Sequence, residues 1–238
     1  MSNPWLLLWL EGPLQAWGHD SKFTRRDTLA FPTKSGVLGM ILSALGLGGE
    51  QKDVLAEFAD LQQVVISYGR CDTRSGELIK SNQIPLLRDF QMVGSGYDDG
   101  DPWTSLLIPK KSDGSKAVGG GTKMTYRYYL QDACFAVVLE IPTDRVGVIS
   151  LALQDPTWDV YLGRKNCVPT DFIYRGCFES FDEAITQAQT IATEKLRTED
   201  YRVLDGEHDG EVLTLMDVPV QFGERKRYRD RSVTVVAA

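Results

Sequence analysis

Residues 10–45 read LEGPLQAWGHDSKFTRRDTLAFPTKSGVLGMILSAL, and this stretch decides the fold of the N-terminal region of the chain. The apolar run at residues 5–10 ends at a Gly-Pro turn and predicts a buried strand. A polar, basic loop follows, and apolar residues then recur at helical spacing across residues 37–45. Thr33 or Ser35 can cap this helix. Because the first turn of a helix carries unpaired N–H groups and the positive end of the helix dipole, its start suits an anion such as phosphate.

The same kinds of pattern in the rest of the chain predict a core of both α-helices and β-strands. Further strands are expected at residues 63–68, 133–141 and 158–162, and further helices at residues 52–60 and 146–153. The resulting order of strand, helix, strand, strand, helix, strand is that of a ferredoxin-like fold. We therefore predict an α+β protein in which residues 1–150 form a ferredoxin-like domain.

One long stretch interrupts this order. Residues 81–126 are rich in Gly, Asp and Lys, and such a long loop is rare in a compact domain unless it has a function. We expect an insertion there, built as a protruding hairpin or a partly disordered arm. Residues 151–238 are expected to hold the last core strand and then a small β-containing C-terminal region. That region is predicted to contain a helix at 181–196 and short strands at 201–204, 212–215 and 232–236.

The composition is that of an ordinary soluble protein. Of the 238 residues, 42% are hydrophobic and 25% are charged. No apolar run approaches the roughly 20 residues that span a bilayer, and the first residues lack the basic start of a signal peptide. The four cysteines form no C-x-x-C pair, which is typical of reduced thiols in the cytoplasm. We expect a cytoplasmic protein with no membrane partner.

Charge is distributed unevenly along the chain. The net charge is −7, but residues 178–217 alone carry eleven acidic and three basic side chains. Cations cluster elsewhere, with five at 109–127 against one acid and five at 222–232 against two acids. A local basic footprint matters more for phosphate binding than the average charge does. The clusters therefore keep nucleic acid among the possible ligands.

Four motifs resemble a known family. They are L-x-G-P-x-Q-A-W-G and R-x-T-x-x-F-P-T-K-S-G-V-L-G within residues 10–39, M-T-Y-R-Y-Y-L-Q-D-A-C-F-A-V at 124–137, and Y-L-G-R-K-x-C at 161–167. Together they resemble the CasD (Cas5) subunit family of type I CRISPR surveillance complexes, most closely the type I-E form. A basic stretch at 225–231 resembles the C-terminal region of several relatives.

The resemblance implies a role in antiviral defence. It implies a subunit with a ferredoxin-like fold of the kind found in RNA-recognition motifs and an inserted thumb, here at about 81–126. Such a subunit caps the 5′ handle of the guide RNA (crRNA). It also implies contacts with the large subunit and the first backbone subunit of Cascade, and with target DNA only indirectly through that complex. No cofactor or metal is implied.

The motifs coincide with the basic clusters, so we predict a non-catalytic RNA-binding site from them. Tyr126 is expected to stack on a base, and Trp17 is either a second stacking residue or a core residue. Thr33, Ser35 and Gly36 are expected to supply contacts at the helix start. The full predicted RNA-binding set is Lys22, Arg25, Arg26, Thr33, Lys34, Ser35, Gly36, Lys110, Lys111, Lys123, Tyr126, Arg127, Arg164 and Lys165.

Two alternatives remain open. Relatives in type I-C systems process the guide precursor with Tyr, Lys and His, and Tyr126, Lys123 and His19 are the candidates for a metal-independent endoribonuclease. A ferredoxin-like small-molecule enzyme or regulator is the other alternative. The Gly-rich stretch 119–123 lacks the P-loop pattern, and the acidic residues at 98–101 fit a solvated loop better than a metal site.

Overall fold

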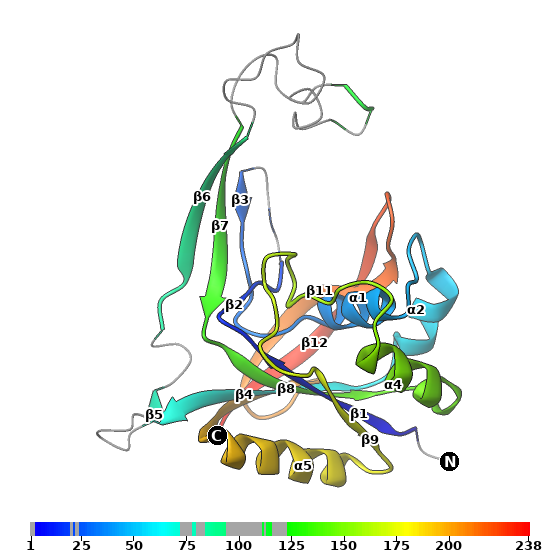
Figure 1. Ribbon diagram of the computed structural model, residues 1–238, viewed down its shortest axis with the longest axis vertical. Helices are drawn as coiled ribbons and strands as arrows, with labels where there is room; N and C mark the ends of the chain where they lie inside the picture. The colour runs from blue at the N-terminus through cyan, green and yellow to red at the C-terminus, as the bar shows by residue number, and fades with distance from the viewer. Residues whose placement is uncertain are drawn as a thin grey trace.

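The computed structural model of the chain describes residues 3–19, 21, 24–71, 78–79, 84–93, 111, 113–115 and 123–238. Its main body is a large sheet with helices on both faces, and a smaller sheet rises from one end of that body (Figure 1). None of the helices in these ranges is long and apolar enough to cross a membrane.

The core sheet has eight strands and is antiparallel throughout. Seven strands lie in the order β11-β12-β10-β4-β8-β1-β9, and β5 pairs with the end of β4. The strands are β1 Trp5–Glu11, β4 Gln63–Cys71, β5 Leu78–Ile79, β8 Cys134–Glu140, β9 Tyr174–Phe178, β10 Arg197–Asp205, β11 Glu211–Gln221 and β12 Arg227–Ala237.

Helices cover both faces of this sheet because its central strands are apolar on both sides. In β1, Leu6, Leu8 and Leu10 join one buried cluster, whereas Leu7 and Trp9 join another. The first cluster includes residues of α1, α2 and α4, and the second includes those of α5, which lies alone below the sheet in Figure 1. The helices are α1 Lys34–Ala44, α2 Lys52–Phe58, α4 Val146–Gln154, preceded by the 3₁₀ turn Thr143–Arg145, and α5 Phe181–Glu194.

The smaller sheet has four strands. It consists of β2 Leu14–Gln15, β3 Arg25–Arg26, β6 Leu87–Val93 and β7 Lys123–Gln131. β2 and β3 pair with different stretches of β7, and β6 pairs with it antiparallel from Leu87↔Tyr129 to Val93↔Lys123. In Figure 1, β6 and β7 rise away from the core sheet. The described strands of the predicted insertion thus form an antiparallel ribbon.

Most of the expected elements are confirmed, but the strand expected at 158–162 is wrong. Those residues form a loop, and their backbone N–H groups do not pair with a neighbouring strand. Trp158 donates to Ser43 O at the end of α1, and Leu162 donates to Cys167 O. The run is apolar because Leu162 is buried under the loop. The strand that instead pairs with the free side of β1 is β9, later in the chain.

The C-terminal strands continue the core sheet, because β10 pairs with β4 along its length. A buried ionic network fixes them to the helical layer. Arg231 of β12 donates to both oxygens of Asp217, at 2.7 and 2.9 Å, and also pairs with Asp205 at the end of β10. Asp217 in turn accepts the backbone N–H of Lys34 at 2.7 Å. The β11–β12 hairpin is therefore fastened to the first turn of α1.

Glu11, at the end of β1, joins that strand to Lys195 and to Arg197 at the start of β10. Its carboxylate accepts from Arg197 at 2.7 Å, from Lys195 at 2.9 Å and from Trp9 Nε1 at 3.0 Å. Burial raises the pKa of Glu11, but the hydrogen bonds from Trp9, Arg197 and Lys195 outweigh it and lower the pKa to about 2. The ionised form is therefore the one that the folded state stabilises.

This shift predicts a pH dependence of stability. Because the folded pKa lies below the unfolded value, the stabilisation is complete above about pH 4.5 and is lost as pH falls toward 2. After allowance for partial exposure, we expect it to be about 2 kcal/mol. Urea unfolding should show Glu11→Gln less stable than the wild type at pH 7, with the difference roughly halved at pH 3. An equal difference in stability at both pH values would show that the ionised form of Glu11 is not the source of the stabilisation.

Candidate nucleic-acid interface

The first turn of α1 is held in place by hydrogen bonds within the protein. Thr33 caps the helix by accepting the N–H of Gly36 at 3.1 Å, as one of the two capping alternatives predicted. The N–H of Lys34 is bound to Asp217. Two donors of the first turn are therefore already paired within the protein, and an anionic side chain already lies at the positive end of the helix dipole. Thr33 itself is buried, and only Ser35 and Gly36 remain partly exposed here.

Lys34 is a correction to the predicted set. Its side chain is 1% exposed, and its ammonium donates to the carbonyls of Ala59 and Leu61 just beyond α2. Burial lowers the pKa of Lys34 to about 8, although Asp205 and Asp217 act in the opposite direction. A buried ammonium that already donates to two carbonyls cannot reach a phosphate outside. Lys34 therefore joins α1 to α2, and its buried ammonium is not available at the surface for a phosphate.

A groove runs over the exposed side of α1. It consists of two adjoining hollows of about 470 and 590 Å³, which share Gly18, Ser35, Lys226 and Tyr228. Three separate stretches of the chain line it: residues 16–43, the loop at 161–163 and the β11–β12 hairpin. The full lining is Ala16, Trp17, Gly18, His19, Ser21, Arg26, Thr33, Ser35, Gly36, Gly39, Met40, Ser43, Tyr161, Gly163, Met216, Phe222, Lys226 and Tyr228.

Cations lie at one end of this groove. The cation Arg26 lines the second hollow, which His19 also lines, and the cation Lys226 lines both hollows. Arg26 and Lys226 are exposed, so their charges face solvent and are accessible to phosphates. Arg25, the neighbour of Arg26, lies 4.9 Å from the ring centroid of Tyr128 and pairs with Asp27 at 2.7 Å. The groove therefore combines a neutral stretch over α1 with a positive end.

Arg164 is a second correction to the predicted RNA-binding set. Its guanidinium donates to the carbonyls of Tyr128, Arg26 and Asp27 at 2.9–3.3 Å and lies 4.7 Å from the ring centroid of Tyr129. Three backbone acceptors and an aromatic face already hold this group. Arg164 therefore positions β3 against β7, while the next residue, Lys165, is exposed as expected for a phosphate contact.

Gly163 brings the loop that carries these residues close to the N-terminal stretch. It has a φ of +93°, and a Cβ at this position would lie 1.8 Å from Ala16 O. We expect Gly163→Ala to lower the free energy of unfolding by about 3 kcal/mol, because both the backbone conformation and the contact oppose a side chain. Gly147→Ala on α4, where a Cβ meets nothing within 4 Å, is the control and should not destabilise the protein. Equal melting temperatures for the two variants would contradict this expectation.

The β6–β7 ribbon presents an aromatic and cationic face. Tyr126 is 39% exposed, and its ring centroid lies 5.3 Å from that of Phe90 and 5.6 Å from Arg88. Arg127 on β7 is partly exposed, and Lys111 is exposed. The remaining predicted positions, Lys22, Lys110 and the side chain of Lys123, lie outside the described residues, as do residues 98–101 and 119–122.

Other predicted residues belong to the protein interior or to ion pairs. Trp17 is 1% exposed and donates to Gln15, so it is the core residue of the two alternatives. In the basic stretch 225–231, Arg229 pairs with Asp60 and Arg231 with Asp217. The sequence reasoning did not select Tyr161, Phe222 or Tyr228 as site residues, because no local signal shows that a C-terminal hairpin lies beside residues 16–43.

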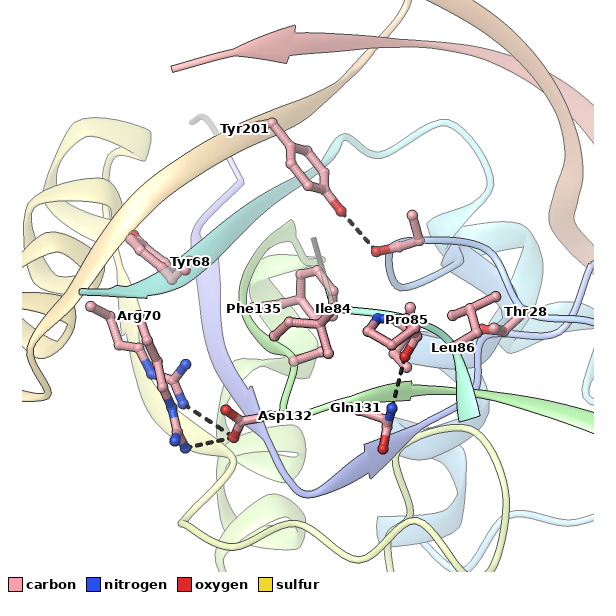
Figure 2. A pocket seen from close by; sticks show the side chains of 15 residues that line it. Thr28, Tyr68, Arg70, Ile84, Pro85, Leu86, Gln131, Asp132, Phe135 and Tyr201 are labelled. Carbon is pink, nitrogen blue, oxygen red and sulfur yellow. Dashed lines mark hydrogen bonds and ion pairs between the residues drawn. The ribbon is translucent and has the colours of Figure 1, made fainter. Parts of the chain in front are cut away.

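A separate cavity of about 360 Å³ lies between the core sheet and the smaller sheet (Figure 2). Phe135, Ile84 and Leu86 belong to its largely apolar lining. Several of its polar groups are engaged within the protein: Tyr201 donates to Ala30 O, and Gln131 donates to Pro85 O. At one end Arg70 pairs with Asp132. This lining suits an apolar group better than a phosphate.

The described ranges offer little for metal or thiol chemistry. Within them no group of three or more His, Cys, Asp or Glu side chains is arranged to hold a metal ion. Cys134 and Cys167 are buried as free thiols, and burial raises the pKa of Cys134 to about 12. His208 is exposed, and its ring lies 2.9 Å from Asp205 O, away from the groove lining.

Comparisons with known proteins agree with the sequence motifs. The family model described as "CRISPR-associated protein (Cas_Cas5)" matches residues 5–234. The chain is 30% identical to the CRISPR system Cascade subunit CasD of Escherichia coli (strain K12), over 94% of each chain. It matches a chain of a structure described as a CRISPR RNA-guided surveillance complex, with a TM-score of 0.68, 27% identity, and coverage of 98% of this chain and 90% of that one. A crystal structure of a Cas protein matches with a TM-score of 0.61 and 28% identity, covering 98% of this chain and 94% of that one. The chain therefore belongs to the Cas5 family of CRISPR-associated proteins, in a form similar to the type I-E subunit CasD.

Proposed function

We propose that this chain is a non-catalytic subunit of a Cascade-type complex in the cytoplasm, where it binds and caps the 5′ handle of the guide RNA. The observation that carries the proposal is the convergence of the family motifs. Motif residues from 10–39 and from 161–167 line one groove, together with the basic β11–β12 hairpin. Lys226 and Arg26 would pair with phosphates there.

The proposed RNA path continues onto the β6–β7 ribbon. Arg25 and Arg127 are available beside it, and Tyr126 offers a partly exposed ring for stacking. We also propose that Lys165 and Lys111 contact phosphates. Arg164 supports this path indirectly, since it fixes β3 and hence the orientation of Arg25 and Arg26.

We propose that the core is a ferredoxin-like domain with a thumb. Strands β4, β8, β1 and β9 lie in that order with antiparallel neighbours, and the crossovers after β1 and β8 contain α1 and α4. On the ribbon, Phe90, Met92 and Met124 are about half exposed, although they are apolar. Phe90 also meets Tyr126 on this face. We therefore propose that the face contacts both the RNA and the neighbouring backbone subunit, while the large subunit binds elsewhere on the chain and target DNA is met only through the complex.

Salt dependence of RNA binding tests the proposal. A site that neutralises about four phosphates of a single strand should give a slope near −3 for log K against log[salt]. The measurement is fluorescence anisotropy of a guide-length RNA between 50 and 300 mM salt. Binding that is absent, or that does not change with salt, would contradict the proposal and favour a small-molecule role.

The alternative function is cleavage of the guide precursor. His19 lines the cationic end of the groove, so a general base would be present there if the protein were a ribonuclease. Incubation of the purified protein with repeat RNA in EDTA separates the two functions. We expect no specific cleavage. Cleavage at one site that disappears in His19→Ala would establish the ribonuclease instead.

A further inference from the structure

Two large apolar side chains, Phe172 and Leu196, are more exposed than any other large hydrophobic side chain that the structure describes. Phe172 is 81% exposed and Leu196 is 75% exposed. Phe172 lies in the loop before β9, and Leu196 lies in the turn after α5. Asp171 precedes Phe172, and its carboxylate pairs with the ammonium of Lys195, the residue before Leu196, at 2.6 Å. The two exposed side chains therefore flank one ion pair.

The backbone of Leu196 is strained as well. Leu196 follows the C-cap residue of α5 and has a φ of +54°. This left-handed conformation is common just after a helix, but the residue that adopts it there is usually glycine, because a Cβ makes it unfavourable. Leu196 thus combines a strained backbone with an exposed apolar side chain, and neither feature stabilises the free chain. Strain of this kind, on a side chain that adds nothing to the core, points to binding.

Contacts with β1 hold this surface in place. Lys195 also pairs with Glu11, at the end of β1, at 2.9 Å. Thr170 donates its backbone N–H to Glu11 O at 2.9 Å, which joins the loop of Phe172 to the same strand end. Val168, earlier in this loop, is a further apolar side chain that is 58% exposed. Because the backbone is already fixed, a partner that binds here pays little entropy to order it.

The charge beside this surface is negative. Exposed carboxylates lie at both ends of α5, and no cation in the described part of the chain pairs with them. They are Glu179, Asp182, Glu183 and Glu194. Lys195, in contrast, is already paired with two carboxylates. Such a border repels the phosphates of RNA and attracts Lys and Arg side chains of a protein.

We propose that Phe172, Leu196 and the outer side of α5 form a docking surface for a protein partner. The partner that fits has an apolar hollow bordered by Lys and Arg side chains, with Phe172 as the aromatic anchor. None of these residues lines the groove, and α5 covers the face of the core sheet opposite to α1 (Figure 1). This inference rests on the proposed function, because the partner is one of the other protein subunits of the complex.

Photo-crosslinking tests which molecule covers this surface. The chain carries p-benzoylphenylalanine in place of Phe172, and the complex is purified through a tag on the chain and then irradiated. We expect a crosslink to one protein subunit, at a peptide that contains apolar residues and Lys or Arg. The matched control carries the same amino acid at Val212, which is 46% exposed on β11, at the other end of the core sheet from β9. It should give no crosslink to that peptide.

Leu196→Gly separates a binding role from a structural one, because it relieves the left-handed backbone and removes the apolar side chain together. We expect the melting temperature of the free chain to rise by about 3 °C. Binding of the crosslinked subunit to the chain–RNA complex should nevertheless weaken about 10-fold, and Phe172→Asp should weaken it at least as much. Val212→Asp is the control for both variants and should leave this binding unchanged.

Glu194→Lys tests the charge of the border. Glu194 is exposed two residues before Leu196, so its reversal should weaken binding of the protein subunit about 3-fold at 150 mM salt. The affinity of the chain for guide-length RNA should not fall. An equal or tighter affinity for the protein subunit in this variant would contradict a partner that is basic around its hollow.

The outcomes separate this inference from the proposed function. If neither RNA nor protein subunits co-purify with the wild type, the proposed function fails and the docking surface fails with it. If the complex assembles but position 172 crosslinks to RNA or to no protein, the docking surface is overturned while the proposed function stands. It is also overturned if Phe172→Asp binds the subunit as tightly as the wild type, or if Leu196→Gly lowers the melting temperature of the free chain.

Discussion

Changing both Arg26 and Lys226 to Glu is expected to weaken RNA binding about 100-fold at 150 mM salt. Both side chains are exposed and both line the cationic end of the groove, so each reversal removes one phosphate contact and adds a repulsion. The salt slope should fall by about 1.4, which corresponds to two phosphates on a single strand. Anisotropy titrations over a salt series measure both quantities.

The control is a second double variant that changes the net charge of the protein by the same amount, at two residues outside the groove lining. Lys52 pairs with Glu50, and Arg145 pairs with Glu57 at 2.6 Å, both away from the groove lining. Changing these two residues to Glu should alter RNA affinity less than 3-fold, because the Debye length at this salt is about 8 Å. If the two double variants weakened binding equally, the average charge and not the groove would explain the RNA binding.

Arg231→Leu is expected to destabilise the fold by about 4 kcal/mol. Arg231 is the partner of both Asp217 and Asp205, and removing it leaves two carboxylates without their cation in a buried network. For a chain of this size the loss corresponds to a decrease in melting temperature of roughly 10 °C. Thermal unfolding followed by circular dichroism measures it.

Arg229, two residues earlier on the same strand, supplies the control. It is also paired, with Asp60, but its side chain is 51% exposed and that of Asp60 is 85% exposed. Surface pairs of this kind contribute little, so Arg229→Leu should change stability by less than about 1 kcal/mol. The ranking would be overturned if Arg229→Leu were as destabilising as Arg231→Leu.

The regular elements followed directly from the sequence. An uninterrupted apolar run predicted β1, and apolar residues at helical spacing predicted α1 and α5, because these apolar side chains are buried in the core. The same rule failed at 158–162, because a loop that covers the end of α1 also buries apolar side chains. Periodicity reports burial, and burial alone does not identify a strand.

The candidate site was only partly predictable, because it depends on contacts between residues that are distant in the sequence. A sequence shows that Lys34 and Arg164 are cationic, but it does not show that distant carbonyls accept their hydrogen bonds. It also cannot place Tyr228 beside Gly39, because that neighbourhood depends on the path of the β11–β12 hairpin. Family motifs therefore pointed to residues that line the groove, and the tertiary contacts show which of those side chains are exposed and which are held within the protein.

In our proposal, this chain holds the 5′ end of a guide RNA in the groove over α1. The most direct measurement is sequencing of the RNA that co-purifies with the tagged chain, for the wild type and for the Arg26→Glu, Lys226→Glu double variant. We predict guide-length RNA with one shared 5′ end in the wild type and strongly reduced RNA in the double variant. RNA with scattered 5′ ends, or the same guide RNA retained equally by both proteins, would contradict the proposal.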